Sequence, residues 1–218
     1  MARKTEETVQ EIIQQLSNRR QGIMSQDEYF LSAVLLPLIE KQGQTHVLFE
    51  VRAEDLDVQP GEICFPGGGI EDHERDNPLN TALRETSEEL GIKEEDVQVL
   101  GALDILPTPM GRLVYPYAGR ILTPEIRPNP QEVAEIFTVP VTFLLNNPPT
   151  KTCAGVATQY SPDFPFDKIP PTYEQGWQKR WCFSIYYFEY EKYFVWGMTA
   201  KILYHFLKLC WPANNNYK

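Results

Sequence analysis

The stretch from Cys64 to Ile92 concentrates residue types that suit metal-assisted chemistry. Three consecutive glycines, Gly67–Gly69, precede a short segment that carries Glu85, Glu88 and Glu89. Like charges three or four residues apart on a helix repel by about 0.2–0.5 kcal/mol per pair, so a divalent cation would offset this cost. Carboxylate oxygens suit Mg²⁺ or Mn²⁺, and a glycine turn lets the backbone approach an ion or a phosphate closely. The pattern therefore indicates a metal and phosphate site.

The glutamates need a helix to position them, and the flanking residues predict one over 78–90. Asn77 suits the N-cap, Pro78 suits the first helical position, and Gly91 suits the stop. The three glutamates span an arc of roughly 100° that is turned away from the apolar face. A solvated acidic helix face is the alternative interpretation of the same pattern. The apolar face comprises Leu79, Leu83, Thr86 and Leu90.

The segment R-E-T-S-E-E-L-G-I, residues 84–92, resembles the second half of the Nudix hydrolase box, R-E-U-X-E-E-X-G-U, at every fixed position. The first half of that box, G-X5-E-X7, fits with a slightly longer loop between its glycine and Arg84. Two residues, Glu74 and Asp76, are open candidates for its acidic position.

Further stretches resemble the coenzyme A pyrophosphatase branch of this family, and the resemblance covers residues 28–208. Asp57 departs from the branch, because many relatives carry a basic residue near this position. The matching stretches are 48–68, which ends in F-P-G-G, together with 132–145 and 194–203.

The resemblance implies that Glu85, Glu88 and Glu89 bind Mg²⁺ or Mn²⁺, which would lower the pKa of a bound water. Glu85 or a later carboxylate would accept the proton of that water. Glu132 is the candidate for the later carboxylate, and a turn-capping role is its alternative. Arg84 is expected to pair with an acidic residue of the loop and to point away from the glutamate arc.

Three residues near the glycine turn are candidates for substrate binding. Arg52 would hold a phosphate bidentately, although an ordinary surface arginine is the alternative interpretation. Gly67 and Gly68 would bring backbone N–H groups close to the substrate.

The order of the expected elements favours an α/β fold, and the resemblance specifies a Nudix α/β/α sandwich with a mixed β-sheet. We expect an N-terminal helical extension at 1–27, a Nudix domain at 28–211 and a tail at 212–218. Residues 124–171 hold ten of the 18 prolines, so we expect loops there, with a short helix near 140–146. The other expected elements are helices at 5–20 and 197–210, a hairpin formed by 30–40 and 45–52, strands at 97–106 and 112–122, and a late hairpin formed by 181–190 and 192–196.

The composition narrows the class of partner. A net charge of −10 argues against nonspecific nucleic-acid binding, which needs a basic footprint. The most apolar tract, residues 193–211, is interrupted by charged residues and is a poor membrane span. The four cysteines have no metal-ligand spacing, so we expect buried thiols in a reducing compartment, and a cytoplasmic location follows as the default. The oligomeric state stays open, with a homodimer as one option.

The resemblance implies metal-dependent hydrolysis of a small nucleotide-derived substrate. Coenzyme A or an acyl-CoA is the expected substrate, with 4′-phosphopantetheine and adenosine 3′,5′-bisphosphate as products. The alternatives are hydrolysis of ADP-ribose or another nucleoside diphosphate derivative, which Asp57 favours, and a non-catalytic ligand-binding Nudix domain. Non-catalytic domains usually lose box glutamates, whereas this chain keeps all of those in R-E-T-S-E-E.

Overall fold

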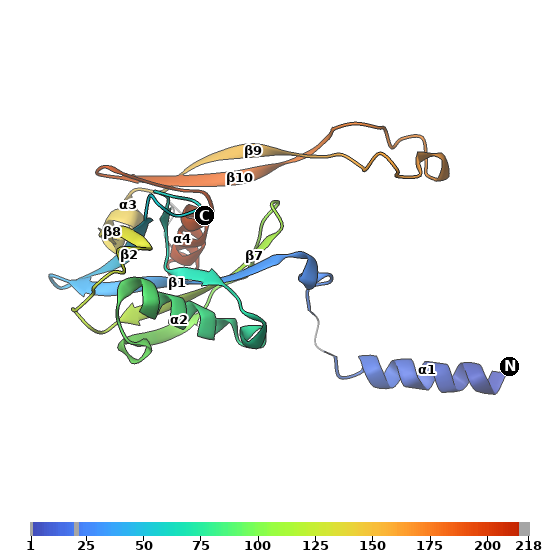
Figure 1. Cartoon of the computed structure of the whole chain (residues 1–218), viewed down its shortest axis with the longest axis horizontal. Coiled ribbons are helices and arrows are strands. Elements are labelled where there is room, and N and C mark those ends of the chain that lie inside the picture. Colours follow the sequence, from blue (N-terminus) through green and yellow to red (C-terminus); the bar gives the residue numbers. More distant parts are fainter. Residues whose placement is uncertain (1, 20–21, 214–218) are drawn as a thin grey trace.

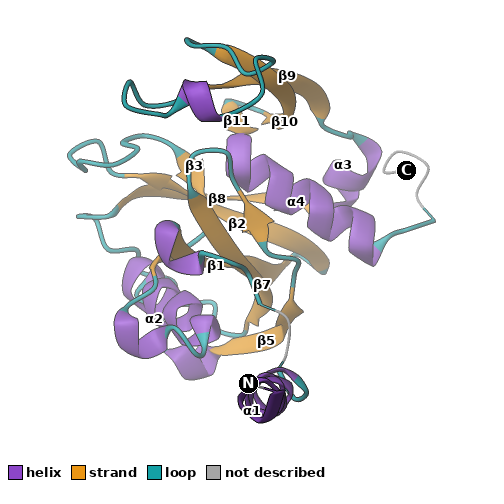
Figure 2. Ribbon diagram, turned by 90° about the vertical axis from the view of Figure 1, so that its right-hand side faces the viewer, coloured by secondary structure: helices purple, strands orange, loops and turns teal. Residues whose placement is uncertain are grey.

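The structure is a computed structural model that describes residues 2–19 and 22–213, except for the side chains of residues 2–7. A mixed β-sheet forms the centre of the protein. Helix α2 (Pro78–Leu90) covers one face of the sheet, and helix α4 (Gly197–Cys210) covers the other (Figure 2). The expected α/β sandwich with a mixed sheet is thereby confirmed.

Strand β1 (Phe30–Lys41) organises the sheet because it pairs with three other strands. It runs parallel to β7 (Arg112–Ile121) and antiparallel to β2 (Gln44–Arg52). Gln42 and Gly43, with φ of 53° and 76°, close the β1–β2 hairpin, which confirms the hairpin predicted from the sequence. The other strands of this sheet are β3 (Ile63–Cys64), β4 (Gly67–Gly69), β5 (Val97–Ala102), β6 (Leu106–Pro107) and β8 (Val133–Pro140).

The two faces of the sheet bury separate hydrophobic clusters. Along β2, Phe49 packs into the cluster under α4, while Leu48 packs into the cluster under α2. Because neighbouring residues of a strand point to opposite faces, the next residue, Glu50, lies on the α2 side. This alternation places one carboxylate of a buried strand beside the acidic helix.

A second sheet of three antiparallel strands lies beside α4 and was only partly expected. It contains β9 (Thr150–Thr158), β10 (Gln178–Tyr190) and β11 (Tyr193–Trp196), of which β10 and β11 form the predicted late hairpin. The β9–β10 ribbon extends well beyond the body (Figure 1). The short helix α3 (Val141–Asn146) lies where it was expected.

The expectation that residues 124–171 form loops is wrong for β8 and β9. Their strand partners are distant in the sequence, since β8 pairs with β2 and β9 pairs with β10. Proline content measures local backbone preference, so it carries no information about such long-range pairing.

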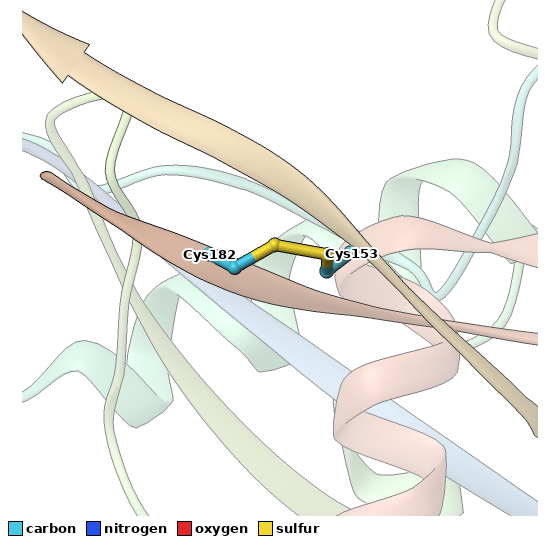
Figure 3. Close-up of a disulfide and its surroundings, with 2 residues drawn as sticks. All are labelled: Cys153 and Cys182. Carbon is cyan, nitrogen blue, oxygen red and sulfur yellow. A yellow bond between two sulfur atoms is a disulfide. The ribbon is translucent and has the colours of Figure 1, made fainter. Parts of the chain in front are cut away.

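The expectation of four free, buried thiols is also wrong. Cys153 and Cys182 form a disulfide between β9 and β10, with their Cα atoms 5.7 Å apart (Figure 3). Cys153 lies opposite Ser184, and Cys182 lies opposite Gly155, so the bridge joins diagonal positions of the ribbon. Only the strand register brings these two side chains together. Of the remaining cysteines, Cys64 is half-buried and Cys210 is exposed.

Helix α1 (Ala2–Leu16) stands apart from the sheet (Figure 1). It ends earlier than the predicted 5–20 helix, whose last residue lies outside the described residues. Among residues 2–19 and 22–213, none of the helices has the length and hydrophobicity that a membrane span requires. The apolar side chains exposed on α1 are Val9, Ile12, Ile13 and Leu16. The 3-10 helices are Gln26–Glu28, Asp72–Glu74, Glu94–Asp96 and Phe166–Lys168.

Candidate active site

Helix α2 has the predicted bounds and carries the acidic residues of the site. Gly91 ends the helix in a left-handed conformation, with φ of 61°. Asn77 occupies the N-cap position, but its side chain makes no capping hydrogen bond and instead donates to the Asn80 Oδ1 atom at 2.9 Å. The C-terminal end of the helix therefore has the expected glycine stop, whereas its N-terminal end has a hydrogen bond between the Asn77 and Asn80 side chains in place of the expected cap.

The three box glutamates have very different environments, which corrects the expected shared arc. Glu88 is half exposed, at 54% of its side chain, whereas Glu89 is 5% exposed and lies under the glycine strand. The Gly67 N–H donates to Glu89 Oε2 at 2.8 Å, and the Arg52 guanidinium lies 3.9 Å from Glu89 Oε1. Glu89 is next to the apolar face of α2. The arc of three glutamates therefore extends from the buried side of the helix, at Glu89, towards solvent.

Gly68 and Glu85 are in direct steric contact. A Cβ atom at position 68 would overlap the Glu85 carboxylate, so this carboxylate would have to move if any other residue stood there. Burial raises the pKa of Glu85, the neighbouring charge of Glu88 raises it further, and the hydrogen bond from Arg84 opposes both. The carboxylate therefore sits between a glycine backbone and an arginine.

Glu74, and not Asp76, makes the contacts expected of the first acidic box residue. Glu74 is buried and accepts hydrogen bonds from Arg84 Nε at 3.1 Å, from Arg84 NH2 at 3.2 Å and from the Thr81 hydroxyl at 2.7 Å. Asp76 is exposed. Since five residues separate Gly68 from Glu74, the G-X5-E spacing holds, and the longer part of the loop follows Glu74.

The expected pairing of Arg84 with a loop carboxylate is confirmed, but its expected direction is wrong. Arg84 NH1 also donates to Glu85 Oε1 at 2.8 Å and lies 3.6 Å from Glu88 Oε2. The long side chain reaches both the loop and the helix, which helical angles at the Cα atom do not reveal.

Sequence reasoning missed Glu50, which contributes a fourth carboxylate from β2. Its side chain is 1% exposed, the Cys64 thiol donates to its Oε1 atom at 3.2 Å, and Oε2 has no hydrogen-bond partner among the described residues. Burial raises the pKa of Glu50, and burial followed by the Glu50 charge raises that of Glu89. A charged residue inside the apolar run V-L-F-E-V was the signal that could have revealed it.

Glu132 precedes β8 and belongs to the same region. Its backbone N–H donates to the Asn129 carbonyl at 3.0 Å, and its carbonyl accepts from the Ala53 N–H at 2.9 Å, so it does close a turn. Its charge also acts on Glu50 and Glu85, raising the pKa of both after the larger effect of burial. The turn-closing role and the carboxylate role are therefore compatible.

The donor chemistry of this cluster suits a divalent cation. Five carboxylates lie near two guanidinium groups, and one buried carboxylate oxygen has no hydrogen-bond partner among the described residues. Uncompensated buried carboxylates are costly unless a cation pairs with them. Within the described part of the chain, no three His, Cys, Asp or Glu side chains are arranged so that they could hold one metal ion. Arg84 contacts two of the carboxylates, those of Glu85 and Glu88. The five carboxylates are those of Glu50, Glu85, Glu88, Glu89 and Glu132.

A family model and several known proteins match this chain. The NUDIX domain family model matches residues 29–157. NudL of Pectobacterium atrosepticum, a Nudix hydrolase, is 35% identical over 174 residues, which cover 79% of this chain and 79% of that protein.

Two coenzyme A diphosphatases are also similar. The mitochondrial enzyme NUDT8 of Homo sapiens is 31% identical over 189 residues, covering 84% of this chain and 70% of that protein. The peroxisomal enzyme NUDT7 of Mus musculus is 36% identical over 115 residues, which cover 52% of this chain and 48% of that protein.

The family match and these relatives place the chain among the hydrolases. The chain belongs to the Nudix hydrolase family. Members of this family generally require divalent metal ions and act on small nucleotide-derived substrates.

Proposed function

We propose that this enzyme hydrolyses the diphosphate bond of coenzyme A or an acyl-CoA. Water adds to one phosphorus atom and the bridging P–O bond breaks, which yields 4′-phosphopantetheine and adenosine 3′,5′-bisphosphate. The observation that carries the proposal is the contact of Glu85 and Glu89 with the Gly67–Gly68 strand, because it joins carboxylates to a backbone that a phosphate can approach closely.

Glu85, Glu88 and Glu89 are the proposed metal ligands, and Glu50 is positioned to support them. A bound Mg²⁺ or Mn²⁺ would neutralise the diphosphate and lower the pKa of a bound water. Glu85 and Glu88, which contact Arg84 in this structure, would be two of the residues that hold the cation. Arg84 remains anchored by its two hydrogen bonds to Glu74.

The remaining proposed roles belong to protein groups that act on the substrate directly. Arg52 binds a phosphate oxygen, since its side chain is 22% exposed and lies beside Glu89. Gly67 and Gly68 allow the close approach of the diphosphate. Glu132, or Glu85 itself, accepts the proton of the attacking water.

The coenzyme A assignment is supported by two similar enzymes whose names state this activity, NUDT7 and NUDT8. Hydrolysis of ADP-ribose or a related nucleoside diphosphate derivative is the second candidate. Asp57 favours it, because this exposed acidic residue stands where many coenzyme A pyrophosphatases carry a basic one. A non-catalytic binding domain is disfavoured by the retention of every box glutamate in R-E-T-S-E-E.

We also propose that residues 28–211 act as one catalytic unit. Helix α4 and β11 pack into the same hydrophobic cluster as β2 and β8, so the chain beyond residue 157 belongs to this core. The N-terminal extension 1–27 and the tail 212–218 lie outside the proposed unit, and a homodimer stays one option for its assembly.

Product analysis by mass spectrometry tests the substrate. The full chain is incubated with Mg²⁺ or Mn²⁺ and, separately, with coenzyme A, 3′-dephospho-coenzyme A and ADP-ribose. We expect adenosine 3′,5′-bisphosphate from coenzyme A at a rate clearly above the other two reactions. Faster cleavage of ADP-ribose would replace the proposed substrate, and no turnover of any would favour the binding-domain alternative.

A further inference from the structure

A second concave site lies on the face of the sheet opposite the acidic cluster. The recess has a volume of about 240 Å³ and opens between α4, β10 and the segment that leads into β6. Pro116 of β7 lines it, whereas the adjacent Tyr115 and Tyr117 pack into the cluster under α2. Since neighbouring residues of a strand face opposite sides, the recess and the glutamates are separated by the sheet.

The wall of the recess is flat and apolar. Tyr186 of β10 stacks on Tyr204 of α4, with ring centroids 4.5 Å apart and an interplanar angle of 16°. Ile105, Leu106 and Ile202 complete the apolar lining. Stacked rings beside aliphatic side chains suit a planar or apolar ligand body.

The rim of the recess is basic, although the chain as a whole carries a net charge of −10. Lys201 and Lys208 of α4 line it, and the Lys151 ammonium lies 5.9 Å from the Tyr186 ring. Among the described residues, none of these three lysines has a carboxylate within salt-bridge distance. Two lining lysines without a carboxylate partner, with Lys151 beyond the Tyr186 ring, favour an anion.

Two further observations bear on the charge at this rim. The Lys201 ammonium lies 3.8 Å from the centre of the Phe183 ring, and burial followed by the Lys151 charge lowers the pKa of Lys201. The opposing acidic group is Asp104, which is exposed and lies 3.1 Å from His205 Nε2. Asp104 therefore lies beside His205, and it is not within salt-bridge distance of Lys201 or Lys208.

We propose that this recess is a second ligand site that binds a small organic anion with a flat apolar body. The head group is a carboxylate or a phosphate, held by Lys201 and Lys208, and the body lies against Tyr186 and Tyr204. The volume of about 240 Å³ lies just below the roughly 300–1,000 Å³ of typical small-ligand pockets, so a single substituted ring fits. The site is distinct from the proposed catalytic cluster and does not depend on the proposed substrate.

Calorimetric titration of the full chain in the presence of EDTA tests this site, with benzoate, phenyl phosphate and the neutral benzyl alcohol as probes. We expect at least one of the two anions to bind with a Kd near 1 mM or tighter, and benzyl alcohol to bind at least tenfold more weakly. A difference between benzoate and phenyl phosphate identifies the preferred head group.

Variants then locate the binding. Lys201→Met keeps the apolar stem and removes the charge, so we expect at least tenfold weaker binding of the anion, and Lys208→Met acts at an exposed position where folding is insensitive. Ile105→Glu, also at an exposed residue, adds a competing carboxylate and should weaken binding similarly. Lys168→Met, on the 3-10 helix between β9 and β10, is the matched control and should bind as wild type.

Three results would overturn the proposal. These are no binding of either anion at millimolar concentration, equal binding of benzyl alcohol, and unchanged binding in both Lys208→Met and Ile105→Glu. Hydrolysis assays of the same variants keep this test separate from the proposed function, because none of these residues belongs to the catalytic cluster.

Discussion

Arg84 donates a hydrogen bond to each oxygen of the buried Glu74 carboxylate, from Nε at 3.1 Å and from NH2 at 3.2 Å. The remaining nitrogen, NH1, donates to Glu85. One guanidinium thus ties the loop after the glycine strand to the acidic helix. The two hydrogen bonds to Glu74 fix the orientation of the planar guanidinium. They therefore also fix the position of NH1, which donates to the Glu85 side chain.

Glu74→Gln should destabilise the protein and loosen this anchor. Removing one partner of a buried ion pair costs about 3–5 kcal/mol, and we expect about 2–3 kcal/mol here because Arg84 is 27% exposed. Urea unfolding measures the change. Asp76→Asn, at an exposed carboxylate of the same loop, is the control and should stay within about 0.5 kcal/mol of wild type.

The pH dependence of the same two proteins checks the cause. The hydrogen bonds from Arg84, and then from Thr81, lower the pKa of Glu74 to about 2 in the folded protein. In the unfolded chain a glutamate titrates near 4.3, so the stabilisation is present above that pH and is lost as the pH falls towards 2. The stability gap between wild type and Glu74→Gln should shrink across this window, and a constant gap would contradict the ion-pair explanation.

Gly68→Ala should reduce catalysis far more than stability. The added Cβ overlaps the Glu85 carboxylate, which is the flexible end of a side chain and can move, so the fold survives while the proposed metal ligand shifts. We expect a loss of about 10²-fold in kcat with Tm changed by only a few degrees. Gly101→Ala, where a Cβ meets no atom within 4 Å, is the matched control. Wild-type activity in Gly68→Ala would show that the Glu85 position is not critical.

Glu132→Gln separates proton transfer from metal binding. If Glu132 is the base, kcat falls by about 10²–10⁴-fold while the Mn²⁺ affinity stays within twofold of wild type. Calorimetric titration with Mn²⁺ and steady-state kinetics give the two quantities. Near-normal kcat together with a large loss in Glu85→Gln would assign the base to Glu85 and leave Glu132 as a turn residue.

Breaking the Cys153–Cys182 disulfide should loosen the β9–β10 ribbon without affecting hydrolysis. In the chain-entropy model a loop of this length is stabilised by up to about 3.5 kcal/mol, and most of the effect stays local because the ribbon extends beyond the body. The double variant Cys153→Ser/Cys182→Ser should be cleaved faster by proteases within 159–177, with hydrolysis within twofold of wild type. Cys210→Ser, at an exposed thiol, should be cleaved as wild type, and equal cleavage of both variants would contradict the stabilising role.

Local sequence signals predicted the parts of the site that local chemistry determines. The bounds of α2 and α4 follow from Pro78, Gly91 and the apolar periodicity of 197–210. The β1–β2 hairpin follows from two short β-rich runs that K-Q-G-Q, residues 41–44, joins. The spacing of R-E-T-S-E-E alone predicted the three glutamates of the helix, without any information about the strands.

Local sequence signals could not predict the features of the site that depend on strand pairing. Glu50 enters the site because β2 pairs with β3, which places it opposite Cys64, and Glu89 is buried because the β4 backbone covers it. The Cys153–Cys182 bridge depends on the register of β9 against β10. Each of these contacts joins residues whose separation in the sequence says nothing about their distance in space.

The central claim is that the carboxylates of α2 support metal-dependent cleavage of a diphosphate, and one comparison tests it most directly. Hydrolysis of coenzyme A is followed in Mg²⁺ for wild type, Glu88→Gln and the control Glu94→Gln, whose exposed carboxylate lies beyond the helix. Wild type and control should release adenosine 3′,5′-bisphosphate at equal rates, with Glu88→Gln slower by about 10²-fold, a difference of about 2.7 kcal/mol in activation free energy. Unchanged hydrolysis in Glu88→Gln would contradict the metal mechanism.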